Sequence, residues 1–415
     1  MRIAVVGAGV SGLVAAHLLA PDHEVTVFEA NPYAGGHTNT LRVDTPYETH
    51  WVDTGFIVFN DRNYPRFERL LDRLGVHGQP SDMSFAVTDE AGDFEYASTS
   101  PNGLFAKRAH LATPWFHRMV ADLLRFQREA RALLASQGDG PSLGHFLEER
   151  RYSRAFVERL IVPQAAAVWS ADPRQMWSFP ARFLIEFFAN HGMLGFRDRP
   201  KWRTVSGGSH RYVEALTAPW RDRLRLSTPV THISRHDDHV TVTPRNHEPE
   251  RFDHVIMATH SDQALKLLAD PTPREHELLG AIPYQANEAV LHTDATLLPR
   301  RRRAWASWNY HLLEEPTGKP TVTYHMNRLQ SLKAEREFCV TLNRSAAIDP
   351  DKVIRTIPYA HPVYTAQGQA AQARHAEISG ENRTHYCGAY WGWGFHEDGV
   401  VSGERVAQRL GARPL

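Results

Sequence analysis

The stretch Gly7-Ala8-Gly9-Val10-Ser11-Gly12 decides the fold class of this chain. It follows an apolar run, Arg2 to Val6, and opens a helical pattern that continues to Leu19 before a second strand pattern, Glu24 to Glu29. This order predicts one β-α-β unit. The first glycine permits a tight turn, the second lets a pyrophosphate approach the backbone, and the third lets helix and strand pack closely. We therefore expect the helix N-terminus to bind phosphate through residues Gly7, Gly9, Val10, Ser11 and Gly12.

Glu29 strengthens this interpretation. It closes the second strand about 20 residues after the glycines, where an acid accepts hydrogen bonds from the adenosine ribose. An acid at this point disfavours a 2′-phosphate. The glycine pattern alone would also fit a structural turn, but strand, helix and acid together favour a dinucleotide site.

The segment after Glu29 indicates which dinucleotide. Ala30-Asn31-Pro32-Tyr33-Ala34-Gly35-Gly36-His37-Thr38 resembles the E-A-x-x-x-x-G-G-R run of the flavin amine oxidase and phytoene desaturase superfamily. In that superfamily the run crosses the FAD pyrophosphate and ribityl. The resemblance therefore assigns five more residues to FAD binding: Ala30, Gly35, Gly36, His37 and Thr38. His37 replaces the usual arginine, and imidazole is mostly neutral near pH 7 whereas guanidinium is always charged.

The other end of the chain carries the same resemblance. Tyr386-Cys387-Gly388-Ala389-Tyr390 is similar to the superfamily's F-A-G-E strand, and Glu397 to Arg405 is similar to the segment that opens its last helix. The resemblance implies that this helix directs its N-terminal amides at flavin N1 and the C2 carbonyl. It assigns Gly388, Gly399 and Val400 to FAD binding. Asp398 stands where the family has glycine.

Segments in the middle of the chain complete the FAD assignment. Asp53-Thr54-Gly55-Phe56 and Thr204 to Gly208 fall where the family lines the isoalloxazine, which assigns Thr54, Gly55 and Phe56. Pro229 to Ile233, followed by Val240 to Val242, resembles a hairpin whose Val230 contacts adenine. The next strand is predicted over Phe252 to Thr259. Non-covalent FAD is expected, because the flavin-proximal segment holds no cysteine of the kind that tethers flavin in monoamine oxidases.

The predicted fold is therefore α/β, with a Rossmann-type FAD-binding domain of the glutathione-reductase-like flavoprotein kind. We expect residues 1–60, 204–265 and 380–415 to form this domain. Insertions 61–203 and 266–379 form a second, α+β substrate domain. The pattern from Tyr64 to Phe196 is helical, and four short runs predict a sheet. These runs are Ala289 to His292, Ala304 to Asn309, Thr321 to His325 and Phe338 to Asn343.

Composition limits the class of protein. The 415 residues include 47 Lys plus Arg and 47 Asp plus Glu, so no global field favours nucleic acid. The two cysteines, Cys339 and Cys387, predict neither a disulfide framework nor a metal site. No apolar stretch approaches the roughly 20 residues of a transmembrane helix. We expect a cytoplasmic protein whose lipid contact, peripheral at the inner membrane face, would be local; Arg300 to Arg303 fits a solvated turn better than a headgroup site.

Two features predict the chemistry: the lack of a nicotinamide-binding motif and the aromatic residues expected near the flavin. No second glycine fingerprint for a nicotinamide cofactor follows a strand, so the substrate itself is expected to reduce the flavin. Tyr390, Trp391, Trp393 and Phe395 predict an aromatic wall that suits an amine or an alkenyl chain equally. The candidate catalytic residues are His396, Tyr390 and Glu397, with a hydrogen-bonding structural role as the alternative for His396.

A narrower resemblance indicates the substrate class. Asp53 to Arg62, Pro80 to Phe85 and Gly388 to Gly399 look like a bacterial subgroup of predicted NAD/FAD-binding proteins, often encoded beside cyclopropane fatty-acyl synthase-like methyltransferases. This implies desaturation or isomerisation of an unsaturated fatty acyl (phospholipid) chain by hydride transfer to flavin N5, with a methyltransferase as partner. The alternatives are a flavin amine oxidase and a non-catalytic flavin-binding partner of a lipid methyltransferase.

Overall fold

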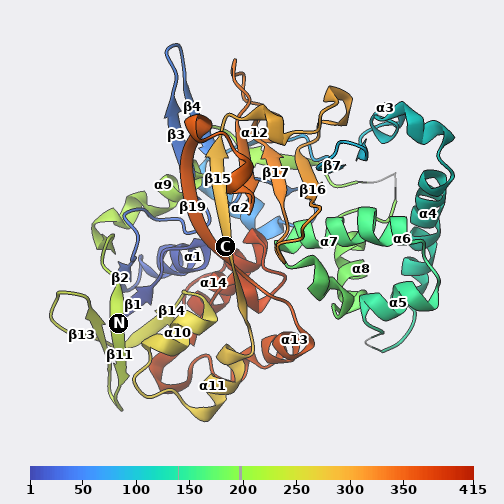
Figure 1. Ribbon diagram of the computed structural model, residues 1–415. Coiled ribbons are helices and arrows are strands. Elements are labelled where there is room, and N and C mark those ends of the chain that lie inside the picture. Colours follow the sequence, from blue (N-terminus) through green and yellow to red (C-terminus); the bar gives the residue numbers. More distant parts are fainter. Residues whose placement is uncertain (139, 196–198) are drawn as a thin grey trace.

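A five-stranded parallel sheet organises one lobe of the molecule (Figure 1). The computed structural model describes residues 1–138, 140–195 and 199–415. The sheet order is β10 (Leu224–Arg225), β2 (Glu24–Phe28), β1 (Arg2–Val6), β14 (His254–Met257) and β20 (Thr384–Tyr386). All four strand pairs are parallel. Strands from the beginning, middle and end of the chain therefore meet in one sheet, which confirms the predicted Rossmann-type α/β fold class.

Close packing of two helices on this sheet follows from glycines. The helices α1 (Val10–Leu19) and α14 (His396–Arg409) lie against each other over one face of the sheet. A Cβ added at Gly403 would lie 2.3 Å from the carbonyl oxygen of Ser11, and one at Gly12 would lie 2.1 Å from that of Gly7. Any side chain at these two positions would push the helices outward. The N-termini of both helices are thus held next to the same edge of the sheet.

The predicted hairpin lies beside the parallel sheet. Strands β11 (Val230–Arg235) and β12 (Val240–Pro244) pair antiparallel, and β13 (Glu250–Phe252) extends them. The prediction of one strand from Phe252 to Thr259 was wrong at its start. Phe252 ends β13, and β14 begins only after Asp253, whose carboxylate accepts a hydrogen bond from the backbone N–H of Arg2.

A seven-stranded sheet supports the second lobe. Its order is β19 (Val353–Pro362), β15 (Tyr284–His292), β18 (Cys339–Leu342), β17 (Val322–His325), β16 (Trp308–Leu312), β7 (Phe85–Asp89) and β8 (Glu95–Ala97). Three of the predicted runs correspond to β15, β17 and β18, and the run that began at Ala304 became β16 about four residues later. The purely helical prediction after Tyr64 was wrong for β7 and β8, whose residues pair with β16.

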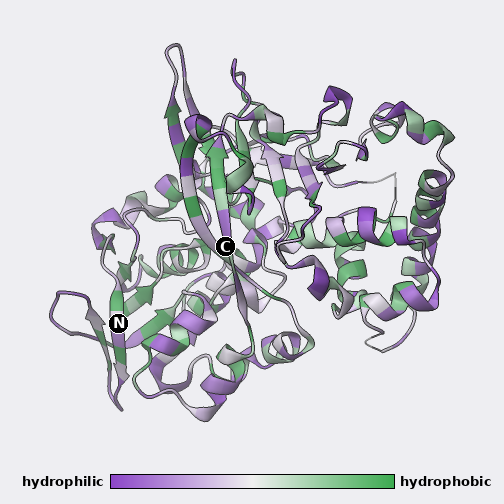
Figure 2. Cartoon of the chain, in the orientation of Figure 1, coloured by the Kyte–Doolittle hydropathy of each residue, from purple (hydrophilic) through white to green (hydrophobic). Residues whose placement is uncertain are grey.

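Helices cover the far side of the second lobe. The main ones are α4 (Pro114–Ala135), α5 (Leu143–Glu149), α7 (Val162–Trp169) and α8 (Ala181–Asn190). Hydrophobic residues lie along the sides of these helices that face one another (Figure 2). Phe196, the end of the predicted helical stretch, falls outside the described residues. Within the described residues, no helix combines the length and the apolarity that crossing a membrane requires.

Each of the two large sheets takes all its strands from one of the two predicted sets of segments. All five parallel strands fall within 1–60, 204–265 and 380–415, and all seven strands of the larger sheet fall within 61–203 and 266–379. The boundaries themselves stay a prediction.

Candidate cofactor and substrate site

One large cavity runs between the lobes. Its volume is about 2240 Å³, and residues from both chain ends line it, among them Gly7, Gly9, Gly388 and Phe395. Pockets for drug-sized ligands measure roughly 300–1,000 Å³. The cavity therefore has room for a dinucleotide and for a second molecule beside it.

Glycines form a cradle at one end of this cavity. Gly9 caps α1 without a side chain, and a Cβ added there would meet no protein atom within 4 Å. Gly36 has a left-handed φ of +60°, and its added Cβ would lie 3.2 Å from the Cα of Gly9. The N–H of Gly35 donates to the carbonyl of Ala8 at 2.7 Å, which joins the glycine turn to the loop after Glu29. The cradle exposes helix N-terminal amides to the cavity, and such amides bind phosphate.

Glu29 lies beside this cradle. Its carboxylate accepts the N–H of Ala8 at 2.8 Å, and the backbone N–H and side-chain amide of Asn31 at 2.8 Å and 2.9 Å. Two carboxylate oxygens offer about four acceptor sites, so about one remains for a ribose hydroxyl. Val230, from the hairpin, lines the same end of the cavity. These positions agree with the adenosine end that the sequence predicts.

Most of the predicted FAD residues line the cavity, and a minority support it from behind. The lining ones are Gly7, Gly9, Val10, Ser11, Glu29, Ala30, Gly35, Gly36, His37, Thr54, Gly55, Phe56, Val230 and Gly388. The supporting ones are Gly12, Thr38, Gly399 and Val400. At Gly399, for example, an added Cβ would lie 2.5 Å from Val10 Cγ1, so this glycine allows α14 to approach α1.

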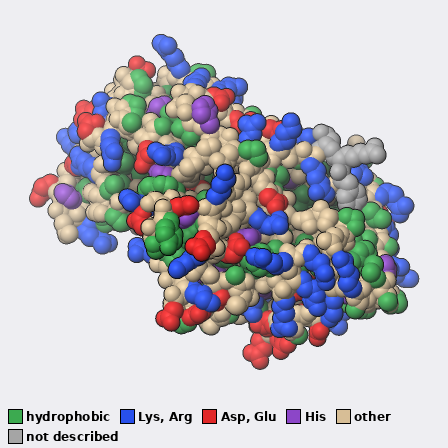
Figure 3. All heavy atoms as spheres, turned by 90° about the horizontal axis from the view of Figure 1, so that it is seen from above, with side chains coloured by type: hydrophobic (Ala, Val, Ile, Leu, Met, Phe, Trp, Pro, Cys, Tyr) green, Lys and Arg blue, Asp and Glu red, His purple; other side chains and the backbone are tan. Residues whose placement is uncertain are grey.

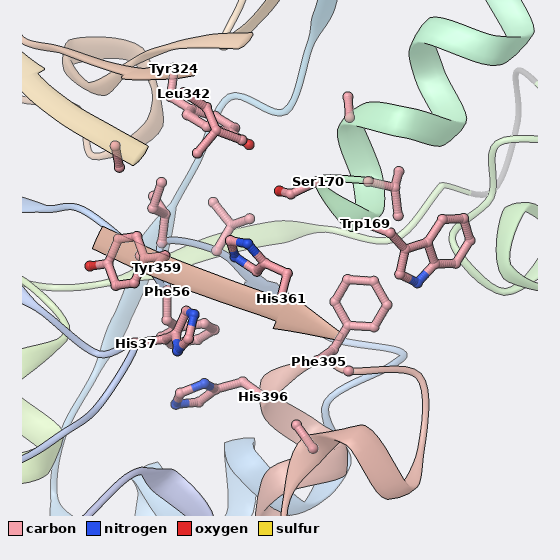
Figure 4. A pocket seen from close by; sticks show the side chains of 18 of the residues that line it. His37, Phe56, Trp169, Ser170, Tyr324, Leu342, Tyr359, His361, Phe395 and His396 are labelled. Carbon is pink, nitrogen blue, oxygen red and sulfur yellow. The ribbon is translucent and has the colours of Figure 1, made fainter. Parts of the chain in front are cut away.

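Three histidines gather in the cavity next to the cradle, and Figure 4 shows two of them, His37 and His361. His37 stacks on Tyr359 with ring centroids 4.7 Å apart, and its centroid lies 5.2 Å from that of His361 and 6.3 Å from that of His260. Burial lowers the pKa of all three, and the other imidazoles lower that of His37 further. They are therefore neutral near pH 7.

Four buried polar atoms of cavity-lining residues lack partners among the described residues. These are His37 Nε2, Trp308 Nε1 and the hydroxyls of Tyr364 and Tyr390. Buried polar groups are normally hydrogen-bonded, so a polar ligand is the natural partner for each. Together with the open amides at Gly9, this makes the residues present fit a bound FAD.

His396, the first candidate catalytic residue, is held from three sides. Its ring stacks on Phe56 with centroids 3.6 Å apart, and its Nε2 lies 2.6 Å from the Tyr212 hydroxyl and 3.4 Å from Thr38 Oγ1. Burial lowers its pKa to about 3. A neutral imidazole with so low a pKa is a poor proton acceptor near pH 7. The geometry therefore favours the structural alternative for this residue.

The other two candidate catalytic residues contact different partners. The carboxylate of Glu397 accepts the N–H groups of Arg66 and Phe67, both at 2.9 Å, and so caps α2 (Pro65–Leu74) outside the cavity lining. Tyr390 does line the cavity, and burial raises its pKa well above the ordinary value. Its phenol thus stays protonated and acts as a hydrogen-bond donor. The three side chains do not form a single proton relay.

Asp398 changes the electrostatics of the helix that begins here. Its carboxylate accepts the N–H of Phe395 at 2.9 Å, and burial raises its pKa to about 6. A carboxylate at this point offsets part of the positive charge at the N-terminus of α14. The chain therefore presents a less positive helix end to the cavity than a glycine at this position would give.

Beyond the histidines, the cavity becomes apolar. Side chains from α3 (Pro101–Leu104), α4 and α7, and from the segments beside them, line this apolar compartment: Leu104, Phe105, Met119, Val120, Leu123, Leu124, Leu160, Ala167 and Val168. An aromatic wall closes the side nearest α14. In it Phe395 stacks on Phe187 at 5.1 Å between centroids, and Trp393 stacks on Phe183 at 3.9 Å.

Several lining residues were not predicted from the sequence. Tyr359 and His361 come from β19, and Ser170 and Trp169 come from the C-terminal end of α7 (Figure 4). His260 follows β14. In β19 the side chains two residues apart share a face, which is the signal that could have identified Tyr359 and His361. Pro358 and Pro362 obscured it, because proline argues against a central strand; β19 is an edge strand, where proline is tolerated.

Comparisons with known proteins indicate the family. The family model for flavin-containing amine oxidoreductases matches residues 10–312. The flavin-dependent L-tryptophan oxidase RebO of Lentzea aerocolonigenes is 27% identical over 278 residues, which are 61% of this chain and 57% of that protein. The chain spans between 34% and 59% of the length of the curated relatives that it matches.

Solved structures share the fold over nearly the whole chain. Cyclohexylamine oxidase from Brevibacterium oxydans IH-35A has a TM-score of 0.69 at 17% identity, covering 99% of this chain and 98% of that one. The CLA-producing fatty acid isomerase from P. acnes has a TM-score of 0.68 at 15% identity, covering 99% of each chain. The family model matches far more than half of the residues. This chain therefore belongs to the family of flavin-containing amine oxidoreductases, and its cofactor is non-covalently bound FAD.

Proposed function

We propose that this enzyme desaturates or isomerises an unsaturated fatty acyl chain. The observation that carries the proposal is the apolar compartment, which is continuous with the cavity around the glycine cradle. Its walls are aliphatic and aromatic side chains contributed by three helices and the segments beside them. A long hydrocarbon chain is the kind of ligand that such a surface binds best, because burial of apolar area is the main favourable contribution.

Residues in different parts of the cavity would have different roles in this reaction. When bound, FAD supplies a two-electron acceptor. The apolar compartment orients the acyl chain along α4 and α7, and the aromatic wall of Phe395 and Trp393 excludes water beside α14. The protonated phenol of Tyr390 offers a hydrogen-bond donor to a polar group in the cavity. Desaturation removes two electrons and two protons from the acyl chain, whereas isomerisation returns them to it.

Amine oxidation is the runner-up, and the aromatic wall is what favours it. An aromatic cage can hold a neutral amine as well as an alkenyl chain. In this chain, however, the face of Phe395 is covered by Phe187. Among the described residues that line the cavity, only Glu29 and Asp82 are acidic, and neither belongs to the apolar compartment. A cationic amine would therefore find no countercharge there.

Anaerobic reduction of the bound flavin separates the candidates. We expect an unsaturated phospholipid or fatty acid to bleach the flavin absorbance, or to be rearranged while the flavin is returned to its oxidised form, and amines to leave both unchanged. Bleaching by amines alone would reverse the ranking. A flavin that no substrate class reduces, in a protein that co-purifies with a methyltransferase, would support the non-catalytic alternative.

A substitution in the apolar compartment tests the same proposal by size. Val120 faces the cavity from α4, and its neighbour Ala121 is exposed. Val120→Trp is expected to prevent the reaction of long acyl chains while flavin content stays at the wild-type value, because the indole fills space away from the cradle. Ala121→Trp is the matched control and should behave as wild type. Undiminished turnover of long chains by Val120→Trp would contradict the proposed substrate path.

A further inference from the structure

The apolar compartment opens to solvent at a particular part of the second lobe. Leu124 lines the cavity and is also 53% exposed, and Pro101 lines it from an exposed position on α3. Phe105 lies between them on the cavity wall. The entrance to the compartment is therefore next to α3 and the first half of α4.

Apolar side chains continue from this entrance onto the outer surface. Leu111 is 55% exposed, and its carbonyl oxygen lies 2.8 Å from the ring nitrogen of His117, one of the outward-facing residues of α4. The ring of His117 in turn lies 5.9 Å from that of Phe105, which connects Leu111 to the cavity wall. Exposed apolar side chains that gather in one region, rather than singly, mark interaction sites.

The same surface carries an excess of positive charge, although the whole chain has equal numbers of acidic and basic residues. Residues 101–135 contain six Lys or Arg and two acidic residues. The two acids, Asp122 and Glu129, are buried or partly buried and already paired with arginines. The outward-facing charge beside the entrance is therefore basic.

Three exposed arginines lie on the segments that flank the entrance. Arg128 is exposed one helical turn after Leu124 and has no ion pair with a described residue. Arg108 is exposed and donates a hydrogen bond to the carbonyl of Phe105 at 2.8 Å. Arg302, 80% exposed and 3.7 Å from the carboxylate of Glu337, belongs to a 3-10 turn that contacts α3. Figure 3 shows apolar and basic side chains intermixed on the side of the molecule that carries α3 and α4.

We propose that this rim, defined by Leu111, Leu124, Arg108, Arg128 and Arg302, docks on an anionic phospholipid bilayer. Basic side chains around exposed apolar ones are what a bilayer surface attracts: the arginines meet lipid phosphates and the leucines enter the headgroup boundary. Docking places the entrance of the apolar compartment against the acyl chains. The inference rests on the proposed function for its purpose, but it makes a claim of its own about binding.

Vesicle sedimentation of the FAD-loaded protein tests the claim. We expect the wild type to sediment with phosphatidylcholine vesicles that contain phosphatidylglycerol, to release as salt is added, and to bind pure phosphatidylcholine far more weakly. Arg128→Glu should weaken binding about thirtyfold, because it reverses one charge at the surface. Leu111→Ser should weaken it about fivefold through lost apolar contact. Neither residue lines the cavity.

Matched controls come from exposed residues of the other lobe. Arg245→Glu and Leu226→Ser make the same chemical changes at exposed positions far along the chain from the rim. Both should bind vesicles within about twofold of wild type. Flavin content and the thermal unfolding midpoint, measured for every variant, show that the rim variants remain folded.

The outcomes separate this inference from the proposed function. Detergent-dispersed fatty acid should reduce the flavin equally in wild type and in both rim variants. The docking surface would be overturned if the rim substitutions left sedimentation unchanged, or if the wild type did not bind anionic vesicles at low salt. Either result would count even if lipid reduces the flavin. Self-association lost in Leu111→Ser, without vesicle binding, would assign the surface to a second copy of the chain and overturn it as well.

Discussion

Gly9 permits a test in which the protein's stability and its cofactor binding respond differently. A Cβ at this position meets no protein atom within 4 Å, and the φ of −74° is one that alanine adopts freely. It would, however, project into the open side of the cradle. Gly9→Ala is therefore expected to fold normally and to bind FAD poorly.

The magnitudes follow from the local geometry. Alanine in place of glycine gains about 0.4–1 kcal/mol by restricting the unfolded chain. At an N-cap position it loses a similar amount relative to glycine, so the free energy of unfolding of the apoprotein should change by less than about 0.5 kcal/mol. Loss of one or two charge-assisted amide–phosphate hydrogen bonds costs about 3 kcal/mol of binding, or about a hundredfold in Kd.

Two measurements on three variants separate the effect on FAD binding from the effect on stability. Urea unfolding of the apoprotein gives stability, and FAD fluorescence quenching gives Kd. Gly280→Ala, at the end of α11 (Pro273–Gly280) with no atom near its added Cβ, should leave both near wild type or slightly raise stability. Gly12→Ala should lower the stability and raise the Kd for FAD, because its Cβ would collide with the Gly7 carbonyl. Wild-type FAD affinity in Gly9→Ala would refute the claim that the glycine cradle binds the FAD phosphates.

Three further predictions follow from single side chains. Glu397→Ala should lower the free energy of unfolding by about 1 kcal/mol in urea, because α2 loses its cap, while substrate still reduces the bound flavin; loss of reduction in a flavin-loaded variant would restore Glu397 as catalytic. Burial lowers the pKa of His311 from 6.5 to about 3, so the unfolded chain binds a proton that the folded one refuses, and stability falls as pH drops from 6.5 towards 3. His311→Asn should make this fall shallower by up to about 1.4 kcal/mol per pH unit in urea unfolding, and an identical slope would contradict the assignment. Burial raises the pKa of both thiols, that of Cys387 to about 12, so a thiol reagent should label Cys339 and Cys387 only after denaturation; rapid labelling of the folded protein would be inconsistent with their burial.

The dinucleotide-binding half of the fold could be predicted because its signals are local. Glycine spacing, a strand before it and Glu29 after it act over about 30 residues, where backbone sterics determine the outcome. The hairpin of β11 and β12 was predictable for the same reason, since its alternation and turn are adjacent in sequence. The second half of the site depends on pairings between distant strands, which no local pattern encodes.

The histidine cluster illustrates that limit. His37, His260 and His361 come from three segments of the chain that are each more than 90 residues apart, and the fold brings them into one cavity. The sequence assigns His37 to FAD binding, as a departure from the usual arginine, but gives no sign of its two neighbours. Its neighbours His260 and His361 could be identified only from the fold, because His361 lies on the edge strand β19. The catalytic assignment of Glu397 met a similar limit, because adjacency to His396 in sequence says nothing of where α2 begins.

FAD binding and turnover depend most on one arrangement: a cradle built from both chain ends that would hold FAD in the cavity that also contains the apolar compartment. Purification, followed by an absorbance spectrum and anaerobic titration with an unsaturated fatty acid, tests it directly. The account predicts a yellow protein that releases about one FAD per chain on denaturation and whose flavin spectrum changes as the fatty acid binds. A colourless protein that takes up no FAD, or a flavin spectrum indifferent to every acyl chain, would contradict it.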